Sequence, residues 1–249
     1  MSTLRRLIAR SANRFGYDIS RKALPPDMEP AFLEAYGLCS PHSMTSIERM
    51  YGLYTAVDHI VRLGIPGDFV ECGVWQGGSS MMMASTLMRG SDRRRLWLYD
   101  TYSGMTEPTE MDRDFGGVAA ADNWQRSKVD DGNQWCRAGL DIVRRNMART
   151  GYPSEHIRYV EGPVERTLLE TSPEQIALLR LDTDWYESTR AELELLYPKL
   201  VKGGILIVDD YGHWQGARQA VDEYFARPDV VAPCLMRMDY TGRIAVRCQ

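Results

Sequence analysis

The chain contains few residues of the kind that cross-link small secreted proteins or build zinc sites. Its 249 residues include 5 cysteines, and no two of them form a CxxC pair. These cysteines are Cys39, Cys72, Cys136, Cys234 and Cys248. An odd and scattered set excludes a regular disulfide framework and offers no zinc-ligand spacing. We therefore expect reduced thiols in a cytoplasmic protein.

Long apolar runs and an excess of positive charge are also missing. No stretch is long enough to cross a bilayer, and residues 1–22 lack the continuous apolar segment of a secretion signal. The formal net charge of −4 gives no electrostatic reason to expect nucleic acid as a partner. We expect a small-molecule partner and no integral membrane segment, and the sequence leaves homo-oligomer formation open.

The N-terminal residues differ from the rest of the chain. Basic and apolar side chains recur at helical spacing over residues 1–22, which predicts an amphipathic basic helix. Such a helix either contacts an acidic surface or a partner subunit, or simply docks at the chain end. Three prolines over residues 25–30 then break the chain. We expect a basic helical arm over residues 1–41 and one domain over residues 42–249.

Apolar runs and helical patterns alternate along this domain. Strands are predicted at residues 67–72, 95–100, 156–161, 176–182 and 204–209, and helices at residues 45–63, 81–88, 139–150, 164–169, 187–200 and 217–225. The alternation predicts an α/β fold with a doubly wound, mostly parallel sheet. Residues 231–246 predict a C-terminal antiparallel hairpin at the sheet edge. Thr45 followed by Glu48 fits a capping box at the start of the first helix.

Carboxylates follow two of the predicted strands. Asp182 and Asp184 end one of them, and Asp209 and Asp210 end the next. Because the carboxyl ends of neighbouring parallel strands line one crevice, Asp182, Asp209 and Asp210 are expected to converge. Carboxylates this close repel one another unless a cation lies between them, and oxygen ligands suit Mg²⁺. The pattern therefore predicts a metal-assisted enzyme.

A glycine-rich turn with the pattern Glu71-x-Gly73-x-x-x-Gly77 follows the first strand. It departs from the G-x-G-x-x-G pattern of dinucleotide folds, and a carboxylate ahead of the first glycine suits an ammonium group better than a pyrophosphate. Asp100 ends the next strand, where a carboxylate can accept hydrogen bonds from ribose hydroxyls. A ligand with an amino-acid end, a ribose and no phosphate describes S-adenosylmethionine.

Longer motifs resemble the macrocin O-methyltransferase family. They are Tyr-Asp-Thr-Tyr-Ser-Gly-Met at residues 99–105, Leu-Asp-Thr-Asp-Trp-Tyr-Glu-Ser-Thr at residues 181–189 and Leu-Tyr-Pro-Lys-Leu at residues 196–200, besides the glycine turn and the second acidic strand end. The resemblance runs from His42 to Phe225. It implies a Rossmann-like class I methyltransferase with a seven-stranded sheet, which uses S-adenosyl-L-methionine and Mg²⁺ to methylate a deoxysugar hydroxyl on a natural product or glycan.

The resemblance also implies roles for single residues. Those expected to bind the cofactor are Glu71, Gly73, Gly77, Ser79, Asp100, Thr101, Ser103, Glu161, Gly162 and Asp182, and those expected to bind the metal are Asp182, Asp209 and Asp210. Catechol O-methyltransferases have a lysine base three residues after the first metal aspartate, where this chain has Trp185. Chemistry then offers two candidate bases, Asp184 beside the crevice and His213 with its ordinary pKa of about 6.5.

Residues 112–135 are rich in turn formers and predict a lid or substrate loop. Trp124 and Trp135 either form a wall of a sugar or aglycone pocket or anchor this loop to the body. The alternatives for the whole chain are the same fold with a catechol-like phenolic acceptor, a metal-dependent hydrolase, and a non-catalytic subunit. The absence of a lysine at Trp185 argues against the phenolic acceptor. The glycine turn and Asp100 argue against the hydrolase, and the intact aspartates argue against the non-catalytic subunit.

Overall fold

The fold is described from a computed structural model that covers residues 25–249 in detail. The predicted basic helix over residues 1–22 lies outside the described residues. Among residues 25–249, no helix combines the length and the apolar character needed to span a membrane.

The compact unit that carries the fold runs from Ala31 to Gln249. Its first helix, α2 (Pro30–Cys39), precedes the domain boundary expected after residue 41. The domain begins this early because α2 contributes to a buried aromatic cluster. The Phe32 ring is fully buried and packs against the rings of Tyr51 and Tyr54. Aromatic burial of this kind makes the helix part of the domain core.

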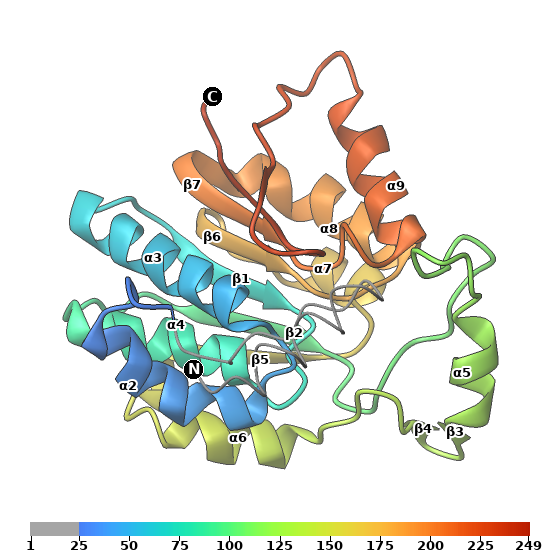
Figure 1. Cartoon of the computed structure of the whole chain (residues 1–249), viewed down its shortest axis with the longest axis horizontal. Helices are drawn as coiled ribbons and strands as arrows, with labels where there is room; N and C mark the ends of the chain where they lie inside the picture. Colours follow the sequence, from blue (N-terminus) through green and yellow to red (C-terminus); the bar gives the residue numbers. More distant parts are fainter. Residues whose placement is uncertain (1–24) are drawn as a thin grey trace, which may run out of the picture. The chain divides into compact units, whose positions relative to one another are not determined.

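The described chain contains one seven-stranded sheet in the order β5-β2-β1-β6-β7-β9-β8 (Figure 1). Its strands are β1 (Asp68–Cys72), β2 (Leu96–Asp100), β5 (Ile157–Glu161), β6 (Ile176–Leu181), β7 (Leu200–Val208), β8 (Met236–Arg237) and β9 (Arg243–Val246). The first five run parallel, whereas β9 pairs antiparallel with both β7 and β8. The predicted α/β fold, with its mostly parallel sheet and C-terminal hairpin, is confirmed.

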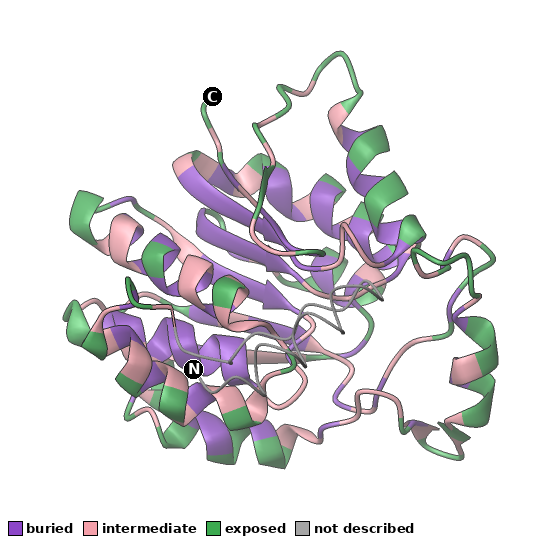
Figure 2. Cartoon of the chain, viewed as in Figure 1, coloured by how far each residue is buried: buried purple, intermediate pink, exposed green. Residues whose placement is uncertain are grey.

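Helices cover both faces of this sheet (Figure 1). One layer contains α3 (Ile47–Leu63), α4 (Gly78–Arg89) and α6 (Leu140–Ala148), and the other contains α7 (Val164–Glu170), α8 (Tyr186–Leu196) and α9 (Gln215–Phe225). Buried residues fill the central strands β1 and β6 and most of β7, while the outer faces of the helices are exposed (Figure 2). Because β1, β2, β6 and β7 are parallel neighbours, the loops that follow them meet at one edge of the sheet.

The start of α3 differs from the expected capping box. Ser46 is the N-cap, and its Oγ accepts a hydrogen bond from the backbone N–H of Arg49 at 3.1 Å. Thr45 instead accepts a hydrogen bond from Arg180 at its Oγ1, at 3.2 Å. Serine and threonine are both good caps, so a helix start can shift by one residue when a tertiary contact recruits one of them.

Residues 112–135 fold onto the domain rather than forming an open loop. The segment contains α5 (Ala121–Arg126) and a small ribbon of β3 (Lys128–Val129) and β4 (Gly132–Asn133). The fully buried carboxylate of Asp112 accepts hydrogen bonds from the backbone N–H groups of Thr109 and Tyr186. This carboxylate ties the segment to the start of α8.

Candidate active site

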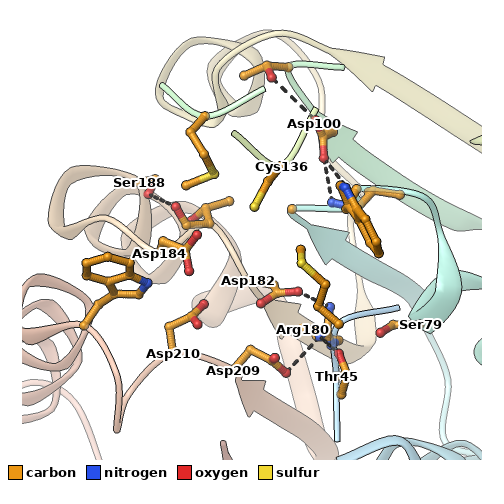
Figure 3. Close-up of a pocket in the computed structure, with 18 of the residues that line it drawn as sticks. Thr45, Ser79, Asp100, Cys136, Arg180, Asp182, Asp184, Ser188, Asp209 and Asp210 are labelled. Carbon is orange, nitrogen blue, oxygen red and sulfur yellow. Dashed lines mark hydrogen bonds and ion pairs between the residues drawn. The ribbon is translucent and has the colours of Figure 1, made fainter. Parts of the chain in front are cut away.

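A cavity of about 370 Å³ opens at the carboxyl edge of the parallel strands (Figure 3). Four neighbouring strands each bring one residue to it: Asp100 is the last residue of β2, and Gly73, Asp182 and Asp209 directly follow β1, β6 and β7. Residues of the α2–α3 connection and of the terminal hairpin turn complete the wall. The convergence expected for the acidic strand ends is therefore present, and the glycine turn shares the same cavity.

Four carboxylates from the loops after β6 and β7 face one another in this cavity, as Figure 3 shows. Burial raises the pKa of Asp182 and of Asp210 well above the ordinary range. It raises the pKa of Asp184 to about 7, with a further contribution from the negative charge of Asp182. Since crowded carboxylates favour protonation, this cluster holds its charge only beside compensating cations.

Arg180 supplies one of these cations and was not anticipated. Its side chain is only 2% exposed, and its guanidinium lies 2.6 Å from Glu71, 2.8 Å from Asp182 and 2.8 Å from Asp209. Arg180 and Glu71 are Cα partners in the β1–β6 ladder, so their side chains project from the same face of the sheet. The sequence feature that could have indicated Arg180 is its position as the single charged residue in the apolar run of residues 176–181.

Arg49 of α3 supplies the second cation. Its Nη1 contacts Asp209 Oδ2, and its Nε lies 2.8 Å from Asp239 Oδ2. Asp239 also accepts a 2.6 Å hydrogen bond from Ser46 Oγ and bonds from the backbone N–H groups of the hairpin turn. The ion pairs therefore connect the first helix of the site, the acidic cluster and the C-terminal hairpin.

The acidic cluster fits a hard cation by donor type. Asp210 Oδ2 is buried without a hydrogen-bond partner, and Asp209 Oδ1 contacts Arg180 without hydrogen-bond geometry. However, within the described residues no three histidine, cysteine, aspartate or glutamate side chains stand in the arrangement of a metal site. Both oxygens of Asp209 contact an arginine, whereas Asp182 is ion-paired through Oδ2 alone, so Asp182 Oδ1 and Asp210 Oδ2 are the oxygens of this cluster most open to a cation.

Asp184 has a left-handed backbone conformation. Its backbone φ is +70°, a conformation that costs free energy for any residue with a Cβ atom. The side chain lines the cavity beside Asp182 and Asp210. Trp185, which stands where catechol O-methyltransferases have their lysine, points away, because its buried indole donates a 3.0 Å hydrogen bond to the Thr106 carbonyl.

The glycine turn requires glycine at its first position. Gly73 has φ +83°, and a Cβ atom there would lie 2.0 Å from the carbonyl oxygen of Asp182. Asp100 holds the next residues of the turn, since its Oδ2 accepts hydrogen bonds from the backbone N–H groups of Val74 and Trp75 at 2.7 and 3.0 Å. The turn is thus held between the end of β2 and the residue after β6, and it borders the cavity.

The remaining expected residues divide into two groups. Those lining the cavity are Gly73, Ser79, Asp100, Thr101, Gly162, Asp182, Asp184, Asp209, Asp210 and His213, whereas Glu71, Gly77, Ser103 and Glu161 do not line it. The Glu71 carboxylate is buried against Arg180 and Ser80, Gly77 is the N-cap of α4, and Glu161 is exposed at the end of β5. Ser103 lines a neighbouring hollow instead.

Aromatic side chains close the other side of the cavity. Trp135 and Trp214 line it, and Trp185 packs on both with ring centroids 5.6 and 4.9 Å away. Trp124 is buried and donates a 2.9 Å hydrogen bond to the Met105 carbonyl. The two tryptophans of residues 112–135 therefore differ: Trp135 forms part of the cavity wall, and Trp124 anchors the segment to the body of the domain.

His213 also lines the cavity and is half-buried. Burial lowers the pKa of its imidazole below the ordinary value, so the ring is mainly neutral at pH 7. Its Nδ1 lies 3.4 Å from the Tyr240 hydroxyl, and its ring packs against Phe115 and Trp214.

This sheet order, with a glycine turn after β1, an acidic residue at the end of β2 and an antiparallel C-terminal pair, defines the fold of a class I methyltransferase. The solved structure of the O-methyltransferase NovP matches with a TM-score of 0.71 and 32% sequence identity, over 84% of this chain and 83% of that one. The calicheamicin methyltransferase CalS11 shares the fold at 18% identity, with a TM-score of 0.58 over 91% of this chain and 99% of that one.

The chain belongs to the macrocin-O-methyltransferase (TylF) family, whose pattern matches residues 27–246. It is 34% identical to the 8-demethyl-8-(2,3-dimethoxy-alpha-L-rhamnosyl)-tetracenomycin-C 4'-O-methyltransferase of Streptomyces olivaceus, over 87% of this chain and 80% of that protein. It is 32% identical to the mycinamicin III 3''-O-methyltransferase of Micromonospora griseorubida, over 74% and 70%. The protein is thus an O-methyltransferase, and neither the phenolic nor the hydrolytic alternative is favoured.

Proposed function

We propose that this enzyme transfers the methyl group of S-adenosyl-L-methionine to a sugar hydroxyl of a glycosylated natural product or glycan, with Mg²⁺ as an essential cation. The observation that carries the proposal is the convergence of Asp182, Asp184, Asp209 and Asp210 on one cavity with the glycine turn and Asp100. The name of one relative supports the sugar acceptor, because it refers to a rhamnosyl group.

The cofactor would lie along the glycine-turn side of the cavity. Gly73 and Ser79 border the expected methionine end, Asp100 and Thr101 the ribose, and Gly162 the adenine. Asp100 is able to accept further bonds while holding the turn, since an ionised carboxylate has about four acceptor positions. Four other residues expected at the cofactor do not line the cavity and would affect cofactor binding only indirectly. They are Glu71, Gly77, Ser103 and Glu161.

The cation would be held by Asp182, Asp209 and Asp210. A divalent ion held there would supply Lewis-acid chemistry that lowers the pKa of the attacking hydroxyl. Arg180 and Arg49 hold Asp209 from its two sides and keep this carboxylate at the edge of the cavity. Their own charges also reduce the repulsion among the aspartates.

Asp184 would accept the proton of the reacting hydroxyl. The hydroxyl oxygen would attack the methyl carbon of the donor, the carbon–sulfur bond would break with its electron pair passing to sulfur, and the hydroxyl proton would pass to the Asp184 carboxylate. A pKa of about 7 suits this role, because a base works best when its pKa is close to the working pH. His213, which also lines the cavity, is the second candidate base.

Binding and turnover test the proposal separately. Isothermal titration of S-adenosylmethionine into the protein, with EDTA or with Mg²⁺, should show binding in both conditions. Methyl transfer to a deoxysugar glycoside should require the divalent ion. Cofactor binding without transfer to any sugar, together with transfer to a catechol, would overturn the acceptor assignment.

The five cysteines are all free, in keeping with the cytoplasmic location that we propose.

A further inference from the structure

One fully buried carboxyl group has no place in the proposed reaction. Glu192 of α8 is 0% exposed, and it does not line the cavity. Its helix neighbours Leu193 and Leu196 belong to the apolar core between the sheet and the helices α7, α8 and α9. Acidic side chains are almost never fully buried unless they are paired. The surroundings of this carboxyl group therefore indicate what it does.

No cation within residues 25–249 compensates the Glu192 carboxyl group, and the charges that act on it are those of the carboxylates Glu165 and Asp182. Glu71 is also buried, but it pairs with Arg180 at 2.6 Å. Burial raises the pKa of Glu192 well above its ordinary value, and the two negative charges raise this pKa further. These surroundings favour the neutral acid over the carboxylate.

The Glu192 carboxyl group joins two segments that border the cavity. Its Oε1 accepts a 2.9 Å hydrogen bond from the hydroxyl of Thr183, in the loop after β6. The thiol of Cys72, the last residue of β1 before Gly73, interacts with the same carboxyl group. Glu192 Oε2 is buried without a hydrogen-bond partner. Because a buried polar atom without a partner costs stability, this residue points to a role other than stabilising the fold.

Thr183 stands between two aspartates of the cavity, Asp182 and Asp184. Its carbonyl accepts a 2.8 Å hydrogen bond from the backbone N–H of Trp185, the N-cap of α8. The hydroxyl and the carbonyl of Thr183 are thus both held by α8 and its cap, which fixes the planar peptide that leads to Asp184. The left-handed φ of +70° at Asp184 persists only where neighbouring contacts of this kind hold it.

We infer that Glu192 is a positioning residue for methyl transfer, because its hydrogen bond to Thr183 holds the backbone that carries Asp182 and Asp184. The inference rests on the roles proposed for these two aspartates and adds the residue that sets their position. A carboxylate at this place would repel Asp182 through the protein interior, whereas a neutral acid accepts the Thr183 hydroxyl without a charge. Glutamine is neutral and has nearly the same shape, so it should serve in place of Glu192, and leucine should not.

The test titrates each variant with S-adenosylhomocysteine and with Mn²⁺, and then measures methyl transfer to a panel of deoxysugar methyl glycosides that includes methyl L-rhamnoside. Glu192→Leu and Thr183→Val should each lower kcat and weaken Mn²⁺ binding by about 10–100-fold, as loss of a group that orients a metal ligand does. The Kd of S-adenosylhomocysteine should not change, and Glu192→Gln should recover most of both losses. Glu194→Leu is the matched control, because Glu194 lies on the same helix, is 44% exposed and does not line the cavity.

Thermal unfolding separates positioning from stability. The Tm of Glu192→Leu should equal or exceed that of the wild type, because leucine removes an unpartnered acid from an apolar core. A double variant with Thr183→Val should lose no more kcat than either single variant, since both changes break one hydrogen bond.

Glu192→Leu with the kcat and Mn²⁺ affinity of Glu194→Leu would overturn the inference. A Tm and a cofactor affinity that fall together with kcat, or a Glu192→Gln as impaired as Glu192→Leu, would also overturn it. A wild type that binds S-adenosylhomocysteine but methylates no glycoside would overturn the proposed function instead, and the Mn²⁺ titrations would then decide the role of Glu192.

Discussion

Replacing Arg180 with methionine removes a cation that three carboxylates share in the interior. Methionine has a similar length and no charge, so the change leaves Glu71, Asp182 and Asp209 without this partner and creates little empty space. Breaking a buried ion pair by removing one member typically costs about 3–5 kcal/mol. For a domain of this size, each kcal/mol corresponds to about 2–4 °C in Tm. We therefore expect Arg180→Met to lower the Tm by about 6–20 °C.

The pH dependence of the variant identifies the cause. Burial already raises the pKa of Glu71 above its reference of 4.5, and loss of Arg180 raises it further. The unfolded chain releases this proton at lower pH than the folded one, so stability falls as pH rises above 4.5 toward the folded pKa. The destabilisation should thus be smallest below pH 4.5 and should grow as the pH rises above this value. Adding Glu71→Gln to Arg180→Met should recover part of the loss.

Thermal unfolding followed by fluorescence at several pH values measures both effects, with Arg190→Met as the control. Arg190 also pairs with two glutamates, Glu187 and Glu194, but its side chain is 45% exposed. Exposed pairs contribute about 0–1 kcal/mol, so this control should remain close to the wild type. If Arg180→Met lost no more stability than Arg190→Met, the ion-pair network would not support the fold, and our account of Glu71 would be refuted.

Other predictions concern the reaction. Asp184→Asn should lower kcat by about 10²–10⁴-fold and leave cofactor binding intact. The kcat of the wild type should fall as the pH drops below about 7, and the midpoint of this fall should move to lower pH when a cation is bound. A kcat that does not change with pH would remove Asp184 as the base. Asp209→Asn should weaken Mn²⁺ binding in titrations while S-adenosylhomocysteine still binds, and equal loss of both ligands would indicate a structural role. Gly73→Ala should destabilise the protein by about 1–3 kcal/mol and abolish cofactor binding, because its Cβ would collide with the Asp182 carbonyl; normal titrations would contradict this.

Local pattern was enough to locate the main elements and the acidic strand ends. Apolar runs with period two or continuous burial mark the strands, and the parallel order of the sheet brings Asp182, Asp209 and Asp100 to one edge whatever surrounds them. The cavity therefore contains most residues that the sequence indicated. The positive φ of Gly73 likewise follows from a sharp turn between a strand and a helix.

Long-range contacts decided the rest. Glu71 and Arg180 are 109 residues apart, and only the pairing of β1 with β6 shows that the glutamate is buried in an ion pair instead of lining the cavity. Likewise, Phe115, His213 and Tyr240 carry no common spacing, so their meeting depends on how three loops pack. Sequence reports what each residue can do locally, whereas the partner that satisfies a buried charge or covers a ring is chosen by packing across the fold.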